Sequence, residues 1–310
     1  MNNAHGNGGD DKGSGILQEA LLVQRCRAKD ATHFVLCKGN KIKFFIHLQG
    51  GEPHLLKCVK AYSGALALLL KLLPIIPYRT LQIAGLGYYA KVNMHSAIQE
   101  CIPNGQSYNI LVGTYDSAQK IVLQCFTESQ EECTFIKVGN TGSAEQMERE
   151  IKFLQAERQF CRFSIPQMSA YRLLSEAAPF NIQVTREFKG EKTEPVMTPE
   201  LYAITREIAG EPTVTDGKEY EFTHGDFAPW NIRTTASGHT VFDWEHCGVR
   251  PKGYDAAYFI IMTEVALRGC SFAEAFETAV STLREIDPAL QLDYQLIYQE
   301  FAKTTKALSF

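Results

Sequence analysis

The chain has 310 residues, of which 45% are hydrophobic and 21% charged, a composition typical of a globular protein with one large domain or two ordinary ones. Its formal net charge of −4 gives no overall electrostatic reason to expect a nucleic-acid partner. The nine cysteines include no C-x-x-C pair, which argues against a disulfide framework and against a zinc site.

The first 15 residues are rich in Gly, Asn and Asp and lack an apolar h-region. We therefore expect a disordered tail over residues 1–15 and no signal peptide. The most apolar run, Ala65 to Pro77, is interrupted by Lys71 and is too short to span a bilayer. We interpret it as part of a buried helix from about Leu55 to Leu73, in preference to a helix on a membrane surface. The expected location is cytoplasmic, with no transmembrane segment.

Residues 16–105 carry strand signals but no chemical motif. The segments 32–38 and 41–48 are rich in β-branched and aromatic residues, and Gly39-Asn40 lies between them. This pattern predicts a β-hairpin with a two-residue turn. We expect residues 16–105 to form an accessory α/β region.

Residues 106–186 predict a strand-rich region with one helix. The expected strands are Tyr108–Gly113, Ile121–Phe126, Cys133–Val138 and Phe180–Val184. The helix is expected over Ala144–Arg158, where Met147, Ile151 and Leu154 fall at helical spacing.

Residues 187–310 are predicted to be mostly helical. Apolar periodicity indicates helices over Pro199–Ile208, Asp255–Arg268, Phe272–Ile286 and Leu292–Ala307. The overall expectation is therefore an α+β chain, strand-rich in the first part and helical in the last.

The strongest chemical signal is an Asp, an Asn five residues later and an Asp twelve residues beyond that: Asp226, Asn231 and Asp243. Turn-like residues 234–238 predict a hairpin that brings Asn231 and Asp243 together. Phosphoryl transfer needs a carboxylate that orients and deprotonates the accepting hydroxyl, and oxygen ligands for Mg²⁺. Each residue alone also fits a turn or a helix cap, but the order and spacing favour a phosphotransferase site.

The pattern H-G-D-x-x-P-x-N-I followed by D-W-E resembles the aminoglycoside phosphotransferase and choline kinase family, small-molecule relatives of protein kinases. The resemblance implies a bilobal, protein-kinase-like fold, with a strand-rich N-lobe in residues 106–186 and a helical C-lobe in 187–310. It implies ATP and Mg²⁺ as cofactors. Asp226 would be the catalytic base, and Asn231 and Asp243 the metal ligands.

Three further residues take roles from the same resemblance. His224 would be a packing residue of the catalytic loop, Glu245 an accessory of the metal site, and Asp255 a buried carboxylate that braces the loop.

Cofactor-binding residues upstream are also implied by the resemblance. Lys137 is by itself an ordinary strand lysine, but in this family that lysine reaches the α- and β-phosphates and pairs with a glutamate of the next helix. Glu150 is the expected partner, with Glu148 or Glu145 as alternatives. Ser117, in a turn that occupies the place of the phosphate-covering loop, is a candidate contact to the β-phosphate. The adenine-binding hinge is expected around residues 183–188.

The acceptor side of the site is expected to be reduced. About 36 residues separate the hinge from His224, with room for one helix, whereas relatives carry extra helices there. A sugar, metabolite, aminoglycoside-like molecule or glycan with a hydroxyl group is the expected acceptor. The alternative is a kinase-like pseudoenzyme that acts as a nucleotide-binding or scaffolding module. A protein kinase is disfavoured by H-G-D in place of H-R-D and by the short run from Asp243 to Asp255. The oligomeric state is not predicted.

Overall fold

The computed structural model describes residues 15–48, 76–126, 133–156, 158–175, 179–187 and 190–305. These residues form two compact units. The first contains the described residues up to 147 together with 168–187, and the second contains 148–167 and the described residues from 190 onward. The predicted helix 55–73 and the predicted tail, except Gly15, lie outside the described residues.

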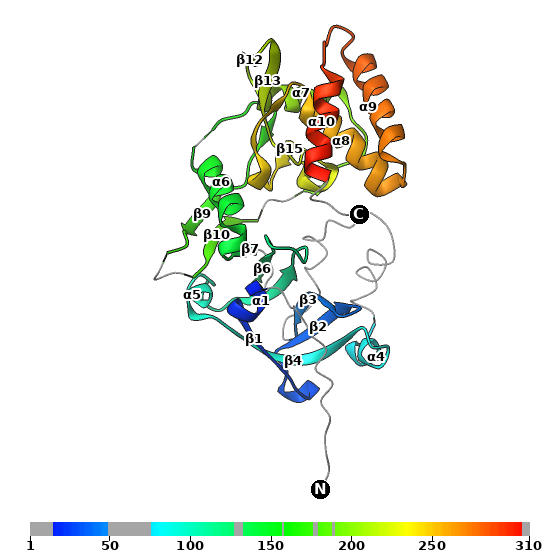
Figure 1. Ribbon diagram of the computed structural model, residues 1–310. Helices are drawn as coiled ribbons and strands as arrows, with labels where there is room; N and C mark the ends of the chain where they lie inside the picture. Colours follow the sequence, from blue (N-terminus) through cyan, green and yellow to red (C-terminus); the bar gives the residue numbers. More distant parts are fainter. Residues whose placement is uncertain are drawn as a thin grey trace. The chain divides into compact units, whose positions relative to one another are not determined.

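The first unit is built on a nine-stranded sheet in which all neighbouring strands are antiparallel (Figure 1). The strand order is β1-β4-β2-β3-β5-β6-β7-β10-β9. The strands are β1 Leu21–Arg25, β2 His33–Lys38, β3 Lys41–His47, β4 Gly87–Met94, β5 Ser107–Val112, β6 Lys120–Phe126, β7 Cys133–Gly139, β9 Met168–Arg172 and β10 Asn181–Arg186. The helical segments are α1 Gly15–Ala20, η1 Ala28–Asp30, α4 Tyr78–Ile83, α5 Ser96–Gln99, η2 Thr141–Ser143 and α6 Ala144–Gln155, the last of which continues into the second unit.

The predicted hairpin and the four strands predicted in residues 106–186 are confirmed, each within two residues at its ends. Gly39 takes a positive φ of 58° in the turn between β2 and β3, a conformation that glycine adopts without strain. Alternate residues of the central strands, such as Ile121 and Leu123 of β6 and Ile136 of β7, are fully buried in one apolar cluster. Alternation of this kind is what a half-buried antiparallel strand requires.

Strands from the predicted accessory region and the predicted N-lobe belong to the same sheet. Phe44 and Phe45 of β3 pair with Leu111 and Ile110 of β5, so the ladder runs across residue 105 without a break. The apolar cluster likewise includes Ile16 of α1 and residues of both regions. The functional division of these residues into an accessory region and an N-lobe remains a prediction.

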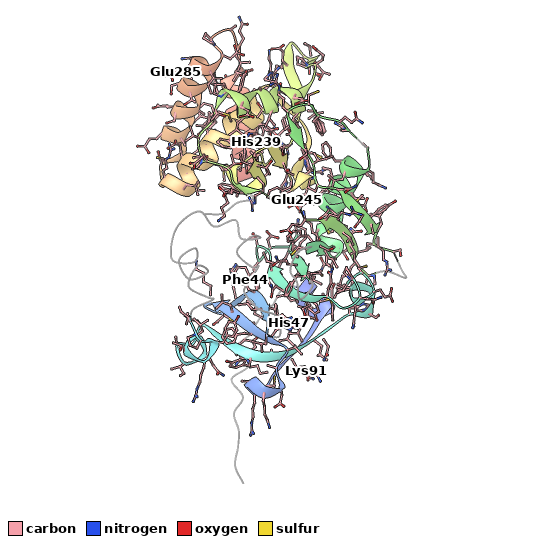
Figure 2. All side chains as sticks on the ribbon, turned by 180° about the vertical axis from the view of Figure 1, so that it is seen from behind. Phe44, His47, Lys91, His239, Glu245 and Glu285 are labelled. Atoms are coloured by element: carbon pink, nitrogen blue, oxygen red, sulfur yellow. The ribbon has the colours of Figure 1, made fainter. Side chains whose placement is uncertain are left out.

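A buried histidine makes the first unit sensitive to acid. His33 on β2 is 1% exposed, and its Nε2 donates to the Tyr108 carbonyl at 3.0 Å. The pKa of His33 is lowered from 6.5 to about 4, mainly by burial; the hydrogen bond to Tyr108 opposes this shift, and the nearby His47 (labelled in Figure 2) contributes to it. As pH falls from 6.5 to about 4, the unfolded chain binds a proton at this position before the folded chain does, so stability is lost in that window.

We expect His33→Gln to flatten the acid dependence of stability. The difference in unfolding free energy between pH 7 and pH 4 should shrink by up to about 3 kcal/mol, because the variant has no proton to bind at this position. Urea unfolding of the variant and the wild type at several pH values measures this difference. Equal slopes for the two proteins would contradict the assignment.

The second unit contains two small sheets and a group of helices (Figure 1). The sheets have the strand orders β11-β14-β15-β8 and β12-β13-β16. The strands are β8 Phe163–Ser164, β11 Glu191–Lys192, β12 Thr213–Thr215, β13 Lys218–Thr223, β14 Ile232–Thr235, β15 Gly238–Val241 and β16 Gly248–Pro251. The helical segments are α7 Pro199–Ala209, η3 Pro229–Asn231, η4 Trp244–His246, α8 Tyr254–Thr263, η5 Glu264–Arg268, α9 Phe272–Ile286 and α10 Tyr294–Thr305.

Residues 190–251 therefore contain more β-strand than predicted, because this part of the chain was expected to be mostly helical. The β12–β13 hairpin turns at Asp216-Gly217, both with positive φ, which is the Asp-Gly signal of a two-residue hairpin. The predicted β14–β15 hairpin is confirmed, with Ile232 opposite Val241. Strand β16 instead pairs with β13, a partner distant in the sequence that local patterns do not reveal.

The predicted helices of the second unit are confirmed, with one correction. Helix α7 begins after Thr198, which caps it by accepting from the Leu201 N–H, and α9 begins with a capping box formed by Ser271 and Glu274. The helix predicted over residues 255–268 is α-helical only to Thr263, because its last five residues form a π-helical turn. None of the helices in the described part of the chain is long and apolar enough to cross a membrane.

Candidate active site

A buried aspartate holds the loop that follows β13. The two carboxylate oxygens of Asp255, at the start of α8, accept from the N–H groups of His224 at 2.6 Å and Gly225 at 2.9 Å. Burial raises the pKa of Asp255 to about 7, although the two N–H donors and Arg250 act in the opposite direction. Gly225 has φ 84°, and a Cβ atom there would lie 2.2 Å from the His246 carbonyl oxygen. Only glycine fits this position, and Asp255 makes the contact expected from the resemblance.

The ring of His224 is fixed by hydrogen bonds at both nitrogens. Nδ1 accepts from the Asp226 N–H at 3.2 Å, so Nε2 carries the proton that is donated to the Phe242 carbonyl at 3.0 Å. The side chain is fully buried and packs against Trp244, with 4.5 Å between the ring centroids. His224 thus joins the loop before Asp226 to the segment before Asp243 as a neutral packing residue.

Asn231 connects the two halves of the motif. Its Nδ2 donates to the Asp226 backbone carbonyl at 2.8 Å and to Asp226 Oδ2 at 2.7 Å, and its own carbonyl accepts from the Phe242 N–H at 3.0 Å. The residue is fully buried, yet Asn231 Oδ1 has no hydrogen-bond partner among the residues that the structure describes. A buried amide oxygen without a donor is costly unless a ligand occupies it.

Asp243 stands in a strained backbone conformation two residues after the end of β15. Its φ of 74° and ψ of 52° lie in the left-handed region, which non-glycine residues rarely adopt. Strain of this kind concentrates at functional sites. Carboxylate oxygens of Asp243, Glu245 and Glu150 all lie within 4.8 Å of one another. Figure 2 labels Glu245, which belongs to the short turn Trp244–His246.

These residues fit a hard divalent cation. Three carboxylates this close repel one another, and a cation that binds oxygen would stabilise their charged forms. Asn231 Oδ1 supplies a further buried oxygen with no partner in the described chain. The donor set is oxygen only, as Mg²⁺ requires.

Glu150 was predicted as the partner of Lys137, and the structure places it in the carboxylate group. It is 2% exposed on α6, and its Oε1 accepts from the Trp244 N–H at 3.3 Å. Phe153 of the same helix stacks on Trp244 with 3.9 Å between the ring centroids. The pairing of Lys137 with Glu150 stays a prediction, and so do the alternatives Glu148 and Glu145 on the same helix.

The two other predicted cofactor residues lie in the first unit. Lys137 is on β7, where it pairs with Val122 of β6 and Gln183 of β10. Ser117 lies in the turn between β5 and β6, and its carbonyl oxygen would be 1.9 Å from a Cβ atom at Gly142. Gly142 therefore permits a close approach between this turn and the start of α6.

One residue in the site was not indicated by the motifs. Burial and the nearby charge of Asp226 raise the pKa of Tyr258, which lies one turn after Asp255 on α8. Its spacing from Asp255 is the one sequence signal that could have pointed to it, because residues three apart share a helix face.

The part of this site from His224 to Tyr258 lies within a segment that matches a known family. Residues 211–289 match the model of the phosphotransferase enzyme family. The resemblance predicted from the motifs is confirmed over this segment, which includes Asp226, Asn231 and Asp243. No protein of curated function gives a significant match to the chain.

Solved structures also match. One is amicoumacin kinase hAmiN in complex with AMP-PNP, Ca²⁺ and Ami, at 13% sequence identity and a TM-score of 0.39. The match covers 64% of this chain and 78% of that chain.

Proposed function

We propose that the chain is a Mg-ATP-dependent phosphotransferase that transfers the γ-phosphate of ATP to a hydroxyl group of a small molecule. The observation that carries the proposal is the dual role of Asn231, which holds Asp226 through its Nδ2 and leaves a buried Oδ1 without a donor among the described residues. A magnesium ligand that also orients the base explains both contacts. The family match over residues 211–289 supports the same chemistry.

In this mechanism Asp226 orients the acceptor hydroxyl and takes its proton. As the acceptor oxygen forms a bond to the γ-phosphorus, the bond from that phosphorus to the bridging oxygen breaks and ADP leaves. Asn231 and Asp243 would hold Mg²⁺, with Glu245 as an accessory ligand. The ion, when bound, would neutralise charge on the phosphate oxygens.

We further propose that the nucleotide half of the site lies in residues 106–186, in a bilobal kinase-like arrangement with residues 187–310 as the C-lobe. Lys137 would contact the α- and β-phosphates, and Ser117 the β-phosphate. Lys137 fits this role because it belongs to a central strand of the sheet and is not fully exposed.

The acceptor is proposed to be a small molecule or a glycan. Within residues 190–223, all of which the structure describes, α7 is the one helix longer than a single turn. Relatives build their acceptor pockets from extra helices in this part of the chain, so an open acceptor side suits a larger substrate.

The proposal is tested by thermal stabilisation of the intact chain with ATP, GTP and ADP, each with and without Mg²⁺. At a nucleotide concentration about 100 times the dissociation constant, binding should stabilise the protein by about 2.7 kcal/mol. We expect stabilisation that requires Mg²⁺, followed by ADP release in a screen of hydroxyl-bearing acceptors.

Two outcomes would contradict the proposal. The absence of a shift with any nucleotide would exclude the nucleotide site. Stabilisation without ADP release, for any acceptor and for water, would favour the alternative of a nucleotide-binding pseudoenzyme.

A further inference from the structure

Three lysines of the β2–β3 hairpin gather like charges at one end of the first unit's sheet. Lys38, the last residue of β2, pairs directly with Lys41, the first residue of β3, and Lys43 follows two residues later. Burial lowers the pKa of Lys43, and the charges of Lys41 and Lys38 lower it further. Within the described part of the chain, no carboxylate forms an ion pair with any of the three.

The stability of the hairpin does not explain this grouping. Gly39-Asn40 is sufficient for the turn, whereas like charges directly opposite each other destabilise a pair of strands. Lysines on edge strands prevent unwanted pairing, but β2 and β3 are interior strands of the sheet, flanked by β4 and β5. Cations that gather without a carboxylate partner among the described residues therefore favour a site for an anion.

The lysines lie beside the turn between β5 and β6, which contains Ser117. The amines of Lys41 and Lys43 are 5.6 and 5.4 Å from the centroid of the Tyr115 ring in that turn. The Tyr115 hydroxyl donates to the Ile42 carbonyl of β3 at 2.9 Å. Because one tyrosine contacts both amines and bonds to the strand that carries them, the lysines and the turn are held together.

The turn is also ordered by side chains of its own. Gln119 Nε2 donates to the Gly113 carbonyl at 3.1 Å, which joins the two ends of the turn. Asp116 Oδ1 accepts from the Ala118 N–H at 2.9 Å. The acidic residue of the turn is thus used within the turn, and the positive charge of the neighbouring lysines is left for a ligand.

We propose that Lys41 and Lys43 bind the β- and γ-phosphates of the nucleotide, together with the turn that contains Ser117. This inference rests on the proposed function, in which Ser117 contacts the β-phosphate. The ammonium group of lysine binds phosphate as a point charge on a flexible stem, and a bound phosphate would offset the repulsion between the two amines. Residues 16–105, which carry no chemical motif, would then take part in nucleotide binding through this hairpin.

The first test is the binding of AMP, ADP and ATP by the double variant Lys41→Gln/Lys43→Gln, measured by isothermal titration with Mg²⁺ present. We expect the Kd for ATP to rise by about 10- to 100-fold, that for ADP by less, and that for AMP to stay within about twofold of wild type. The gradient follows because the lysines act on the phosphates furthest from the nucleoside.

The matched control is Lys29→Gln/Lys91→Gln, which removes the same charge from exposed positions on η1 and β4 (Lys91 is labelled in Figure 2). It should bind all three nucleotides as wild type does. A wild-type affinity for ATP in Lys41→Gln/Lys43→Gln would overturn the proposal. An equal loss of affinity for AMP, ADP and ATP would also overturn it, because the lysines would then act on the fold or on the nucleoside.

The second test uses inorganic tripolyphosphate, which carries the anion without the nucleoside. We expect it to raise the melting temperature of wild type and to raise that of Lys41→Gln/Lys43→Gln much less. Equal stabilisation of both would overturn the lysine site, while nucleotide binding by wild type would leave the proposed function intact. If wild type bound tripolyphosphate but no nucleotide, the proposed function and the nucleotide assignment of the lysines would fail, and the anion site would stand.

Discussion

Replacing Asp226 by alanine is expected to lower kcat by about 10²- to 10⁴-fold while Mg-ATP still stabilises the chain. The carboxylate is the proposed proton acceptor, and the variant has no other group at that position. Asn231 Nδ2 keeps its hydrogen bond to the Asp226 backbone carbonyl, so the amide that also offers Oδ1 to the metal stays in place. Nucleotide binding should therefore survive. Single-turnover ADP release measures the loss of kcat, and thermal shifts on the same preparation measure Mg-ATP binding.

The control for this variant is Glu285→Ala, which removes an exposed carboxylate from α9 (Figure 2). We expect it to match wild type in both turnover and Mg-ATP binding. Full activity in Asp226→Ala would exclude Asp226 as the base. Equal loss of binding and turnover would instead assign Asp226 to the metal site.

Asp243→Asn is expected to weaken Mg-dependent nucleotide binding by on the order of 100-fold, which corresponds to about 2.7 kcal/mol. Asparagine is the better test residue than alanine because it tolerates the left-handed backbone that Asp243 adopts, so the change removes charge and leaves the fold intact. The loss should be confined to the titration with Mg²⁺ present. Isothermal titration with ATP measures the nucleotide affinity with and without Mg²⁺.

Glu245→Gln is the informative comparison. Glu245 shares the carboxylate group with Asp243, but the resemblance makes it an accessory, so we expect a smaller loss of affinity than in Asp243→Asn. An unchanged Mg-ATP affinity in Asp243→Asn would contradict its assignment as a metal ligand. A larger loss in Glu245→Gln would move the main ligand to Glu245.

Short-range features of this protein follow from its sequence. Gly39-Asn40 between two β-branched segments determines the β2–β3 hairpin, because few residue pairs permit that turn. Ser271 and Glu274 determine the start of α9 through reciprocal hydrogen bonds. Asp226 and Asn231 meet for the same reason: they are five residues apart in one loop, and a single side chain spans the gap.

Long-range contacts were decided by the tertiary structure. Trp244 donates to Glu150 across 94 residues of sequence, and Asp255, on a helix that follows the loop, accepts from the His224 N–H. The ladder between β3 and β5 joins regions that composition had separated. In each case the contact forms because apolar faces are buried over the whole unit. The residues next to each partner in the sequence therefore do not reveal which partner it will have. The sequence by itself therefore indicated which residues are proposed to carry the chemistry, through type and spacing, whereas only the folded chain decided which carboxylates gather around Asp243.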